Sequence, residues 1–231
     1  MEFYDAMRKR FGHQGWWPGQ TPLEICVGAI LTQNTNWANV EKAIANLKAA
    51  DCMSVSALHA APASALAKLL RPAGYFNIKA RRLKNFIAHV QRTHGGDLGG
   101  PGADLGGPGG SGRGFLDRPV PTLREELLSI NGIGRETADS IILYAACKPA
   151  FVVDAYTYRV LLRHSLIAPE DDYESIKELL ESHLPTDVGL WNDFHAQFVA
   201  VGKNHCRPAA RCEGCPLEPY PHDRGHDRVL P

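Results

Sequence analysis

The residues whose types and spacing suggest chemistry are concentrated in one stretch, residues 127–159. Gly132 and Gly134 allow a tight turn with positive φ, which would leave backbone N–H groups pointing outward. From Arg135 onward, apolar residues recur at the spacing of a helix face, so a helix is predicted to start directly after the turn. Amides exposed at a helix N-terminus form an anion site, and in a DNA-binding protein that anion is a phosphate.

A candidate carboxylate lies further along the chain, where the apolar run from Phe151 to Val153 is followed by Asp154. Placed beside a sugar carbon, a carboxylate stabilises developing positive charge and orients or deprotonates water, as in glycoside hydrolysis. Asp is also a favoured N-cap, and a helix is predicted over residues 156–164. The residues alone favour neither role for Asp154, and the two roles are compatible.

Aromatic and polar residues near the N-terminus form a third group of candidates. Trp16 and Trp17 stand directly before Pro18, which fits either a plug for a buried loop or a stacking wall for a planar base. The next predicted helix is nearly all apolar and breaks at the polar residues 32–36, which precede Trp37. These polar residues either cap that helix or form a finger that enters a DNA duplex.

Composition limits the class of protein. The 231 residues, of which 44% are hydrophobic, are enough for one large domain or two small ones. No apolar run is long enough to span a bilayer, and residues 1–12 lack the order of a signal peptide, so we expect a cytoplasmic protein. Because 25 basic residues balance 25 acidic ones, DNA binding would rely on local basic clusters. One such cluster is Lys79, Arg81, Arg82 and Lys84, although a run of charges like this is usually a solvated helix face.

Helical periodicity runs through most of the chain and predicts an all-α protein. Thr21 followed by Pro22 is typical of a helix start, and Thr122 with Glu125 matches a capping box. The single candidate for a strand is residues 151–153. Helices are predicted over residues 40–47, 56–69, 79–94, 156–164, 173–183 and 190–201.

Residues 95–114 depart from this pattern, because they are mostly glycine with some Pro, Asp and Leu. The sequence Asp-Leu-Gly-Gly-Pro-Gly occurs twice within them, starting at Asp97 and Asp104. Such a segment buries too little apolar surface to offset the entropy of ordering it. We therefore expect a mobile, dispensable surface insertion between two helices, and not a repeat fold.

Six cysteines divide into two groups. Three are scattered among apolar residues, as expected of core cysteines: Cys26, Cys52 and Cys147. The other three have the spacing C-x5-C-x2-C near the end of the chain: Cys206, Cys212 and Cys215. A disulfide framework does not fit a cytoplasmic chain of this size, so the second group is interpreted as ligands of a metal or an iron–sulfur cluster.

Together, these motifs resemble the helix-hairpin-helix and Gly/Pro/Asp signature of the endonuclease III superfamily of DNA base-excision glycosylases. The turn leads to Glu136, and the step of eighteen residues from Glu136 to Asp154 matches the family pattern, as do Val153 and Arg159. Within the superfamily, the sequence is similar above all to 3-methyladenine DNA glycosylases of the endonuclease III type. This likeness is carried by residues 16–18, 29–35, 71–77 and 131–139.

The resemblance implies a role for most of these residues. Asp154 would be catalytic, and Gln33 would fill the gap left by an extruded base. Family members that cut the DNA strand carry a lysine where this chain has Glu136, so a monofunctional glycosylase with water as nucleophile is expected. The base pocket would comprise Trp16, Trp17, Pro18 and Trp37, and the DNA contacts would come from Gln33, Gly132, Ile133, Gly134, Arg135 and Thr137.

The resemblance also implies a [4Fe–4S] cluster at Cys206, Cys212 and Cys215, although the match is partial. The family pattern is C-x6-C-x2-C-x5-C, whereas here the first gap is five residues and Pro221 stands at the expected fourth cysteine. His222, His226 or a non-protein group would have to complete the cluster. A zinc site and a metal-free loop are the alternatives.

The implied fold is all-α with two domains and an active-site cleft between them. A six-helix domain would span residues 21–135, with the hairpin and the insertion, and the second domain would combine residues 1–20 with 136–231. The expected activity is the flipping and hydrolytic removal of an alkylated purine such as 3-methyladenine from double-stranded DNA. The protein would be a monomer with no membrane partner. A bifunctional glycosylase/lyase, a mismatch-specific glycosylase and a noncatalytic DNA-binding module are the alternatives.

Overall fold

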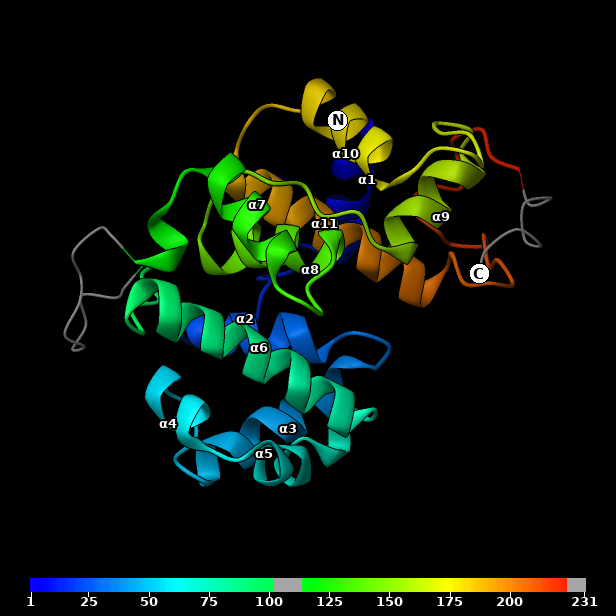
Figure 1. Ribbon diagram of the computed structural model, residues 1–231. Coiled ribbons are helices and arrows are strands. Elements are labelled where there is room, and N and C mark those ends of the chain that lie inside the picture. Colours follow the sequence, from blue (N-terminus) through cyan, green and yellow to red (C-terminus); the bar gives the residue numbers. More distant parts are fainter. Residues whose placement is uncertain (102–113, 224–231) are drawn as a thin grey trace. The chain divides into compact units, whose positions relative to one another are not determined.

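The computed structural model describes residues 1–101 and 114–223, and every regular element in these ranges is a helix (Figure 1). The all-α expectation is therefore confirmed. The chain divides into two compact units. One combines Met1–Trp16 with the chain from Pro149 onward, and the other is Trp17–Lys148. None of the helices in the described ranges has the length and apolar character of a membrane span.

The unit Trp17–Lys148 is built around α2, Pro22–Leu31. Thr21 caps this helix as predicted, because its Oγ1 accepts a hydrogen bond from the Glu24 N–H at 3.2 Å. Most of α2 is buried, and it contacts α3, α6 and α8. The remaining elements of this unit are α3 (Trp37–Ala49), α4 (Val55–Ala60), α5 (Ala63–Leu69), η1 (Arg71–Ala73), α6 (Phe76–His94), η2 (Phe115–Asp117), α7 (Val120–Ser129), α8 (Arg135–Ser140) and η3 (Ile141–Ala145).

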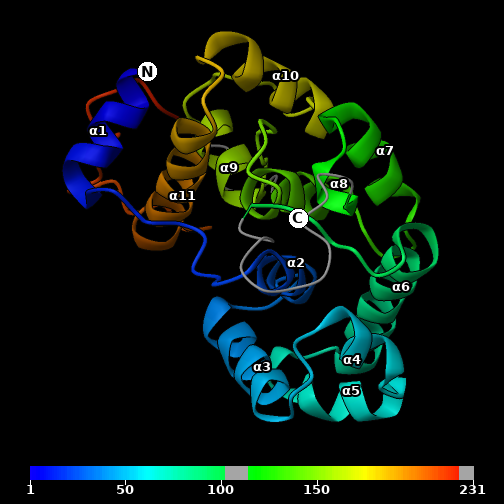
Figure 2. The same cartoon turned by 90° about the vertical axis from the view of Figure 1, so that its left-hand side faces the viewer.

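Two predictions about this unit are wrong in detail. The helix predicted over residues 56–69 is two helices, α4 and α5, which lie along α6 (Figure 2). Pro62 separates them, because a proline pushes the preceding residue, here Ala61, into an extended conformation. The capping box predicted at Thr122 is also absent: α7 starts at Val120 without a side-chain cap, and Pro121 lies in its first turn.

The second unit contains α1 (Glu2–Phe11), α9 (Ala155–Arg163), α10 (Tyr173–His183) and α11 (Val188–Asn204). Its core is α11, which contacts α1 and α9 and buries Phe194 and Phe198. The candidate strand at residues 151–153 is not a strand, and no strand occurs among the described residues. Side chains of α10 bind its backbone instead: the Phe151 N–H donates to Glu181 Oε1 at 2.7 Å, and its carbonyl accepts from Lys177 Nζ at 3.3 Å.

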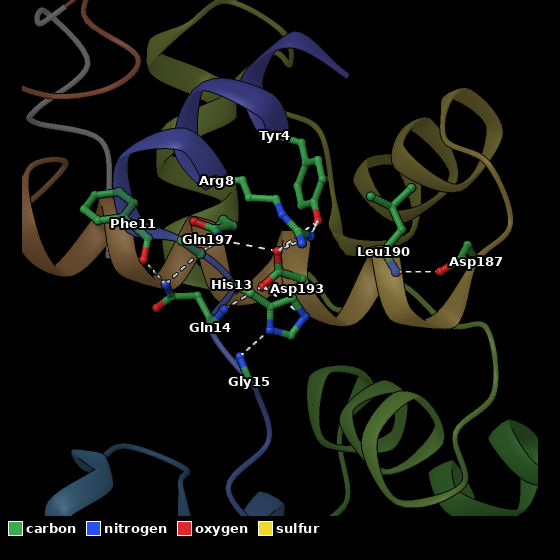
Figure 3. A network of polar contacts seen from close by, with 11 residues as sticks. Tyr4, Arg8, Phe11, His13, Gln14, Gly15, Asp187, Leu190, Asp193 and Gln197 are labelled. Atoms are coloured by element: carbon green, nitrogen blue, oxygen red, sulfur yellow. Dashed lines mark hydrogen bonds and ion pairs between the residues drawn. The ribbon is translucent and has the colours of Figure 1, made fainter.

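A buried carboxylate fastens α1 to α11 (Figure 3). Asp193 of α11 is completely buried and accepts hydrogen bonds from Tyr4 Oη at 2.9 Å and from the backbone N–H of Gln14 at 2.8 Å. Gln197 Nε2 donates to the same carboxylate at 3.3 Å, and Arg8 forms an ion pair with it at 3.4 Å. Residues from the two ends of the chain thus satisfy one buried charge.

The glycine-rich segment is partly described. Its two ends pair with each other: the Phe115 N–H donates to the Asp97 carbonyl at 3.1 Å, and the Leu116 N–H donates to the Leu98 carbonyl at 2.8 Å. The Asp117 carboxylate accepts from the Gly100 N–H at 3.0 Å. The backbone groups of Asp97, Leu98 and Gly100 are thus hydrogen-bonded to the residues that follow the segment, and the expectation of a mobile insertion stays a prediction. Residues 102–113, on which the rest of that expectation falls, lie outside the described residues.

Candidate active site

The two glycines of the turn between α7 and α8 differ in backbone conformation and in the space around them. Gly132 has φ +100°, and a Cβ there would lie 2.3 Å from Arg82 Cγ, so both conformation and space require glycine. Gly134 has φ −95° and occupies the N-cap position of α8, where a Cβ would meet no atom within 4 Å. The prediction of positive φ is therefore wrong for Gly134, and its lack of a side chain instead keeps the approach to the helix start open.

The other predicted hairpin residues also differ in exposure. Arg135 is exposed at the first position of α8, whereas Thr137 is buried. Ile133 is only 5% exposed, and its N–H donates to the Ile130 carbonyl at 3.0 Å. Ile133 therefore anchors the turn in the core, and its amide is already used within the chain.

Gln33 lies in the turn after α2 and is held against the hairpin of the same unit. Its Nε2 donates to Thr137 Oγ1 at 2.9 Å and to the Gly132 carbonyl at 3.3 Å, and its Oε1 accepts a hydrogen bond from Arg82. The neighbouring Asn34 is exposed and adopts a left-handed conformation with φ +54°. The structure thus brings together three of the predicted DNA-contact residues.

Of the three predicted pocket tryptophans, two lie together. The rings of Trp17 and Trp37 meet edge to face with centroids 5.2 Å apart, and Tyr144 lies 5.1 Å from Trp17. Trp17 also packs on α2, because a Cβ at Gly28 would lie 3.1 Å from its Nε1. The aromatic cluster of this unit is therefore Trp17, Trp37 and Tyr144.

Trp16 belongs to the other unit, because the boundary between the two units falls between Trp16 and Trp17. There, Lys203 Nζ stands 5.9 Å from the centroid of the Trp16 ring. Pro18 is exposed in the segment before α2. Adjacent residues in the sequence thus serve different units, which no local pattern could indicate.

Asp154 is the N-cap of α9, and its two oxygens have different surroundings. Oδ1 accepts hydrogen bonds from the Thr157 N–H at 2.8 Å and from Thr157 Oγ1 at 3.0 Å. Oδ2 lies 3.6 Å from Nε2 of His195, a buried residue of α11. The capping role is therefore present, and it uses only one of the two oxygens.

These contacts keep the carboxylate ionised. Burial raises the pKa of Asp154, but the nearby His195 imidazole, together with the two Thr157 donors, outweighs it and holds the pKa below its usual value. An ionised, largely buried carboxylate at the start of a helix has the properties needed to stabilise a nearby cation.

Two residues of these clusters, His195 and Tyr144, have no place in the sequence-based site. Each lies on a helix that the sequence marks only as apolar. One signal for His195 exists, since Asp193, His195 and Gln197 are three polar residues within the buried stretch of α11. Tyr144 has no comparable signal, because an aromatic residue on an apolar helix face is ordinary.

The basic cluster predicted on α6 is mostly used within the chain. Lys79 is 1% exposed and donates to the Ala73 carbonyl at 2.7 Å, and burial together with Arg82 lowers its pKa to about 8. Lys84 donates to the carbonyls of His59 and Ala61 at the end of α4. Of the four residues, only Arg81 is classed as exposed. The cluster therefore fits neither a DNA-binding face nor a solvated helix face.

The three cysteines near the end of the chain line one pocket, which is also lined by His164, His205 and His222. Their sulfur atoms do not all lie within 4.8 Å of one another, as donors to a single ion would. Each thiolate of a [4Fe–4S] cluster binds a different iron, so wider spacing suits a cluster better than a zinc ion. Arg163 donates to Cys206 Sγ at 3.1 Å.

Pro221, at the position of the family's fourth cysteine, has no side chain that could act as a ligand. His222 lines the pocket, and its Nδ1 hydrogen-bonds to the Tyr220 carbonyl at 2.8 Å, which directs ligation to Nε2. His226, the other candidate, lies outside the described residues. Among the described residues, His222 is thus the sequence-predicted imidazole that lines this pocket beside the three thiols.

Comparisons with known proteins agree with this geometry. Residues 27–186 match the model of the HhH-GPD superfamily of base excision DNA repair proteins. A protein of Methanocaldococcus jannaschii named as a DNA repair glycosylase is 41% identical, over 95% of this chain and 94% of its own length. Endonuclease III of Thermotoga maritima is 27% identical, over 85% of this chain and 81% of its own length.

Solved structures give the same result. The 3-methyladenine DNA glycosylase of H. pylori, solved with bound 1,N6-ethenoadenine, has a TM-score of 0.70 and 26% identity, covering 87% of this chain and 97% of its own. An endonuclease III–DNA complex has a TM-score of 0.74 at 23% identity, covering 93% of this chain and 89% of its own, which shows a shared fold.

The helical fold is thus that of a base-excision repair protein. The chain belongs to the HhH-GPD superfamily, which confirms the resemblance seen in the sequence. Membership and relatives together support a DNA glycosylase that acts in base excision repair.

Proposed function

We propose that this chain is a monofunctional DNA glycosylase that removes an alkylated purine, such as 3-methyladenine, from double-stranded DNA as a monomer. The observation that carries the proposal is the ionised Asp154 carboxylate, together with Glu136 at the position where strand-cutting relatives have a lysine.

Asp154 acts on the sugar. Breaking the N-glycosidic bond builds positive charge on the deoxyribose, and a fixed carboxylate stabilises that charge without needing to reorganise. Oδ1 stays hydrogen-bonded to Thr157, which leaves Oδ2 to act on the sugar carbon and the attacking water. The His195 contact keeps the carboxylate oriented and ionised during the reaction.

Glu136 sets the end point of the reaction. A lyase forms a Schiff base between an amine and the opened sugar, and the exposed first-turn residue of α8 offers a carboxylate instead. Water is therefore the nucleophile, and an abasic site is the product.

The preference for an alkylated purine is supported by the cluster of Trp17, Trp37 and Tyr144. A methylated purine is cationic and electron-poor, so it stacks favourably on aromatic faces. It also leaves the sugar readily, so one carboxylate suffices. The similarity to the H. pylori 3-methyladenine glycosylase supports the same choice.

The DNA is held by the hairpin and by Gln33. The open start of α8 at Gly134 accepts a phosphate, and Arg135 adds positive charge. Gln33, fastened to Thr137 and Gly132, fills the gap left by the flipped base.

We also propose that Cys206, Cys212, Cys215 and His222 hold a [4Fe–4S] cluster. When bound, the cluster would cross-link the loop after α11 and would carry no step of base release. Arg159 and Arg163 of α9 hold the start of this loop through the carbonyls of Cys206 and Pro208. Iron and sulfide analysis of protein purified without oxygen, compared with Cys212→Ser, tests this assignment.

The test of the proposed activity is incubation with methylated duplex DNA, with chromatography of released bases and strand analysis before and after alkali. Release of 3-methyladenine with breaks only after alkali supports the proposal. Breaks without alkali would show that another amine replaces the missing lysine. No base release from methylated DNA would exclude alkylated purines as the substrate.

A further inference from the structure

A second set of convergent side chains lies in the unit Trp17–Lys148, away from the hairpin residues discussed above. His89 and His94 lie near the end of α6, and both direct Nε2 at the same oxygen of Glu126 in α7, at 2.7 and 2.8 Å. The three donor atoms all lie within 4.8 Å of one another. Among the described residues, this is the single group of three or more His, Cys, Asp or Glu side chains that meets this spacing.

We propose that His89, His94 and Glu126 form a binding site for one zinc ion. Two imidazoles and one carboxylate are a known donor set for Zn²⁺, which leaves a fourth tetrahedral position for water. Zinc bonds of about 2.0–2.2 Å place neighbouring tetrahedral donors roughly 3.4 Å apart. The present contacts of 2.7 and 2.8 Å thus need to widen by about 0.6–0.7 Å to admit the ion.

The surroundings of these donors resemble those of protein metal sites, because the donors are largely buried and have a hydrophobic backing. The side chains of His89, His94 and Glu126 are only 12%, 9% and 13% exposed. The ring of Phe115 lies against both histidines, with centroids 6.0 and 5.2 Å away. Partial burial with a hydrophobic backing limits the motion of the ligands and lowers the local dielectric constant.

Two arginines border the site. Arg118 donates at 2.7 Å to the Glu126 oxygen that the histidines do not contact, and so fixes the orientation of the carboxylate. The exposed Arg92 lies 3.5 Å from His89 Nδ1. Both charges oppose cation binding.

The position of the site in the chain gives it a structural role. Glu126 is 37 residues from His89 and 32 from His94, and the glycine-rich segment lies between them in the sequence. A metal clip that closes a long loop stabilises a fold by reducing the freedom of the unfolded chain. Zinc here would join the end of α6 to α7 across the insertion.

The test uses the metal-stripped full chain titrated with Co²⁺, a coloured substitute for zinc. One equivalent should bind, with visible d–d absorption of tetrahedral character and without the near-ultraviolet band of cobalt–thiolate bonds. That band would report the cysteine pocket, so the spectrum separates the two candidate metal sites. Zinc should raise the melting temperature of the same protein in a concentration-dependent way.

Glu126→Gln and His94→Gln should each weaken cobalt binding by more than about tenfold. His59→Gln, which changes an exposed histidine of the same unit, is the matched control and should bind like the parent. Far-ultraviolet circular dichroism checks that each variant is folded. Two ligand variants are used so that the test still holds if one of them does not fold. Absence of the cobalt spectrum in the parent, or its persistence in both ligand variants, would overturn the assignment. The three residues and Arg118 would then form a charge network without a metal ion.

Discussion

Two helix starts in this chain, those of α8 and α9, are built in opposite ways. At α9, Asp154 supplies a carboxylate that accepts the Thr157 N–H. At α8, Gly134 supplies no side chain, and the space beside it is open. Both helix starts attract negative charge, but one receives it from the chain and the other is left accessible to an anion from outside. The comparison suggests that Asp154 is fixed for chemistry, whereas Gly134 is kept clear for DNA.

Asp154→Asn tests most directly whether Asp154 does more than cap α9. Asparagine caps a helix as well as aspartate does, so folding and DNA binding should change little. Loss of the negative charge should slow base release by about 10²–10⁴-fold. Single-turnover base release and DNA affinity, measured together, test this result. Asp187→Asn, which alters the capping aspartate of α11, is the matched control. Release within a few-fold of the parent rate would leave Asp154 with the capping role alone.

Gly132→Ala should have the next largest effect, on stability. Its φ of +100° and the nearby Arg82 Cγ both oppose a side chain. We expect a loss of about 1–3 kcal/mol in the free energy of unfolding, measured by urea denaturation. An unchanged unfolding midpoint would mean that the turn relaxes without cost.

Gly134→Ala should affect binding and not stability. Its φ is accessible to alanine and its surroundings are open, so the free energy of unfolding should stay within about 0.5 kcal/mol of the parent. A methyl group in the path of a phosphate should raise the Kd for duplex DNA about tenfold, which is the worth of one charge-assisted hydrogen bond. Fluorescence anisotropy at fixed salt measures this change. Equal effects of both glycine variants on stability would remove the distinction between them.

The smallest expected effect is on the pH dependence of stability. The fold holds the pKa of Asp154 below its usual value, so its ionised form stabilises the protein above the unfolded pKa of about 3.9. This contribution disappears as pH falls through the lower pKa of the folded state. The difference in unfolding free energy between the parent and Asp154→Asn should therefore be largest near neutral pH and shrink in acid. A difference that grows on acidification would reverse the sign of the shift.

Local signals predicted the elements well, and the failures have physical causes. Tyr173–His183 matches its predicted bounds because helical spacing alone defines it. The role of Asp154 as a cap was among the alternatives because Asp is common at that position. The contact of His195 with Asp154 joins residues 41 positions apart, and no spacing rule reaches so far. The separation of Trp16 from Trp17 depends on where the chain leaves one unit, which is a property of the whole fold.

The buried carboxylate of Asp193 also constrains the order in which parts of the protein can fold during synthesis. Tyr4 emerges from the ribosome 189 residues before the partner of its hydroxyl group. The unit Trp17–Lys148 is continuous in sequence, so its contacts are all available while synthesis is still in progress. Helix α1 can therefore reach its final place only after α11 has been translated, although α1 is made long before α11.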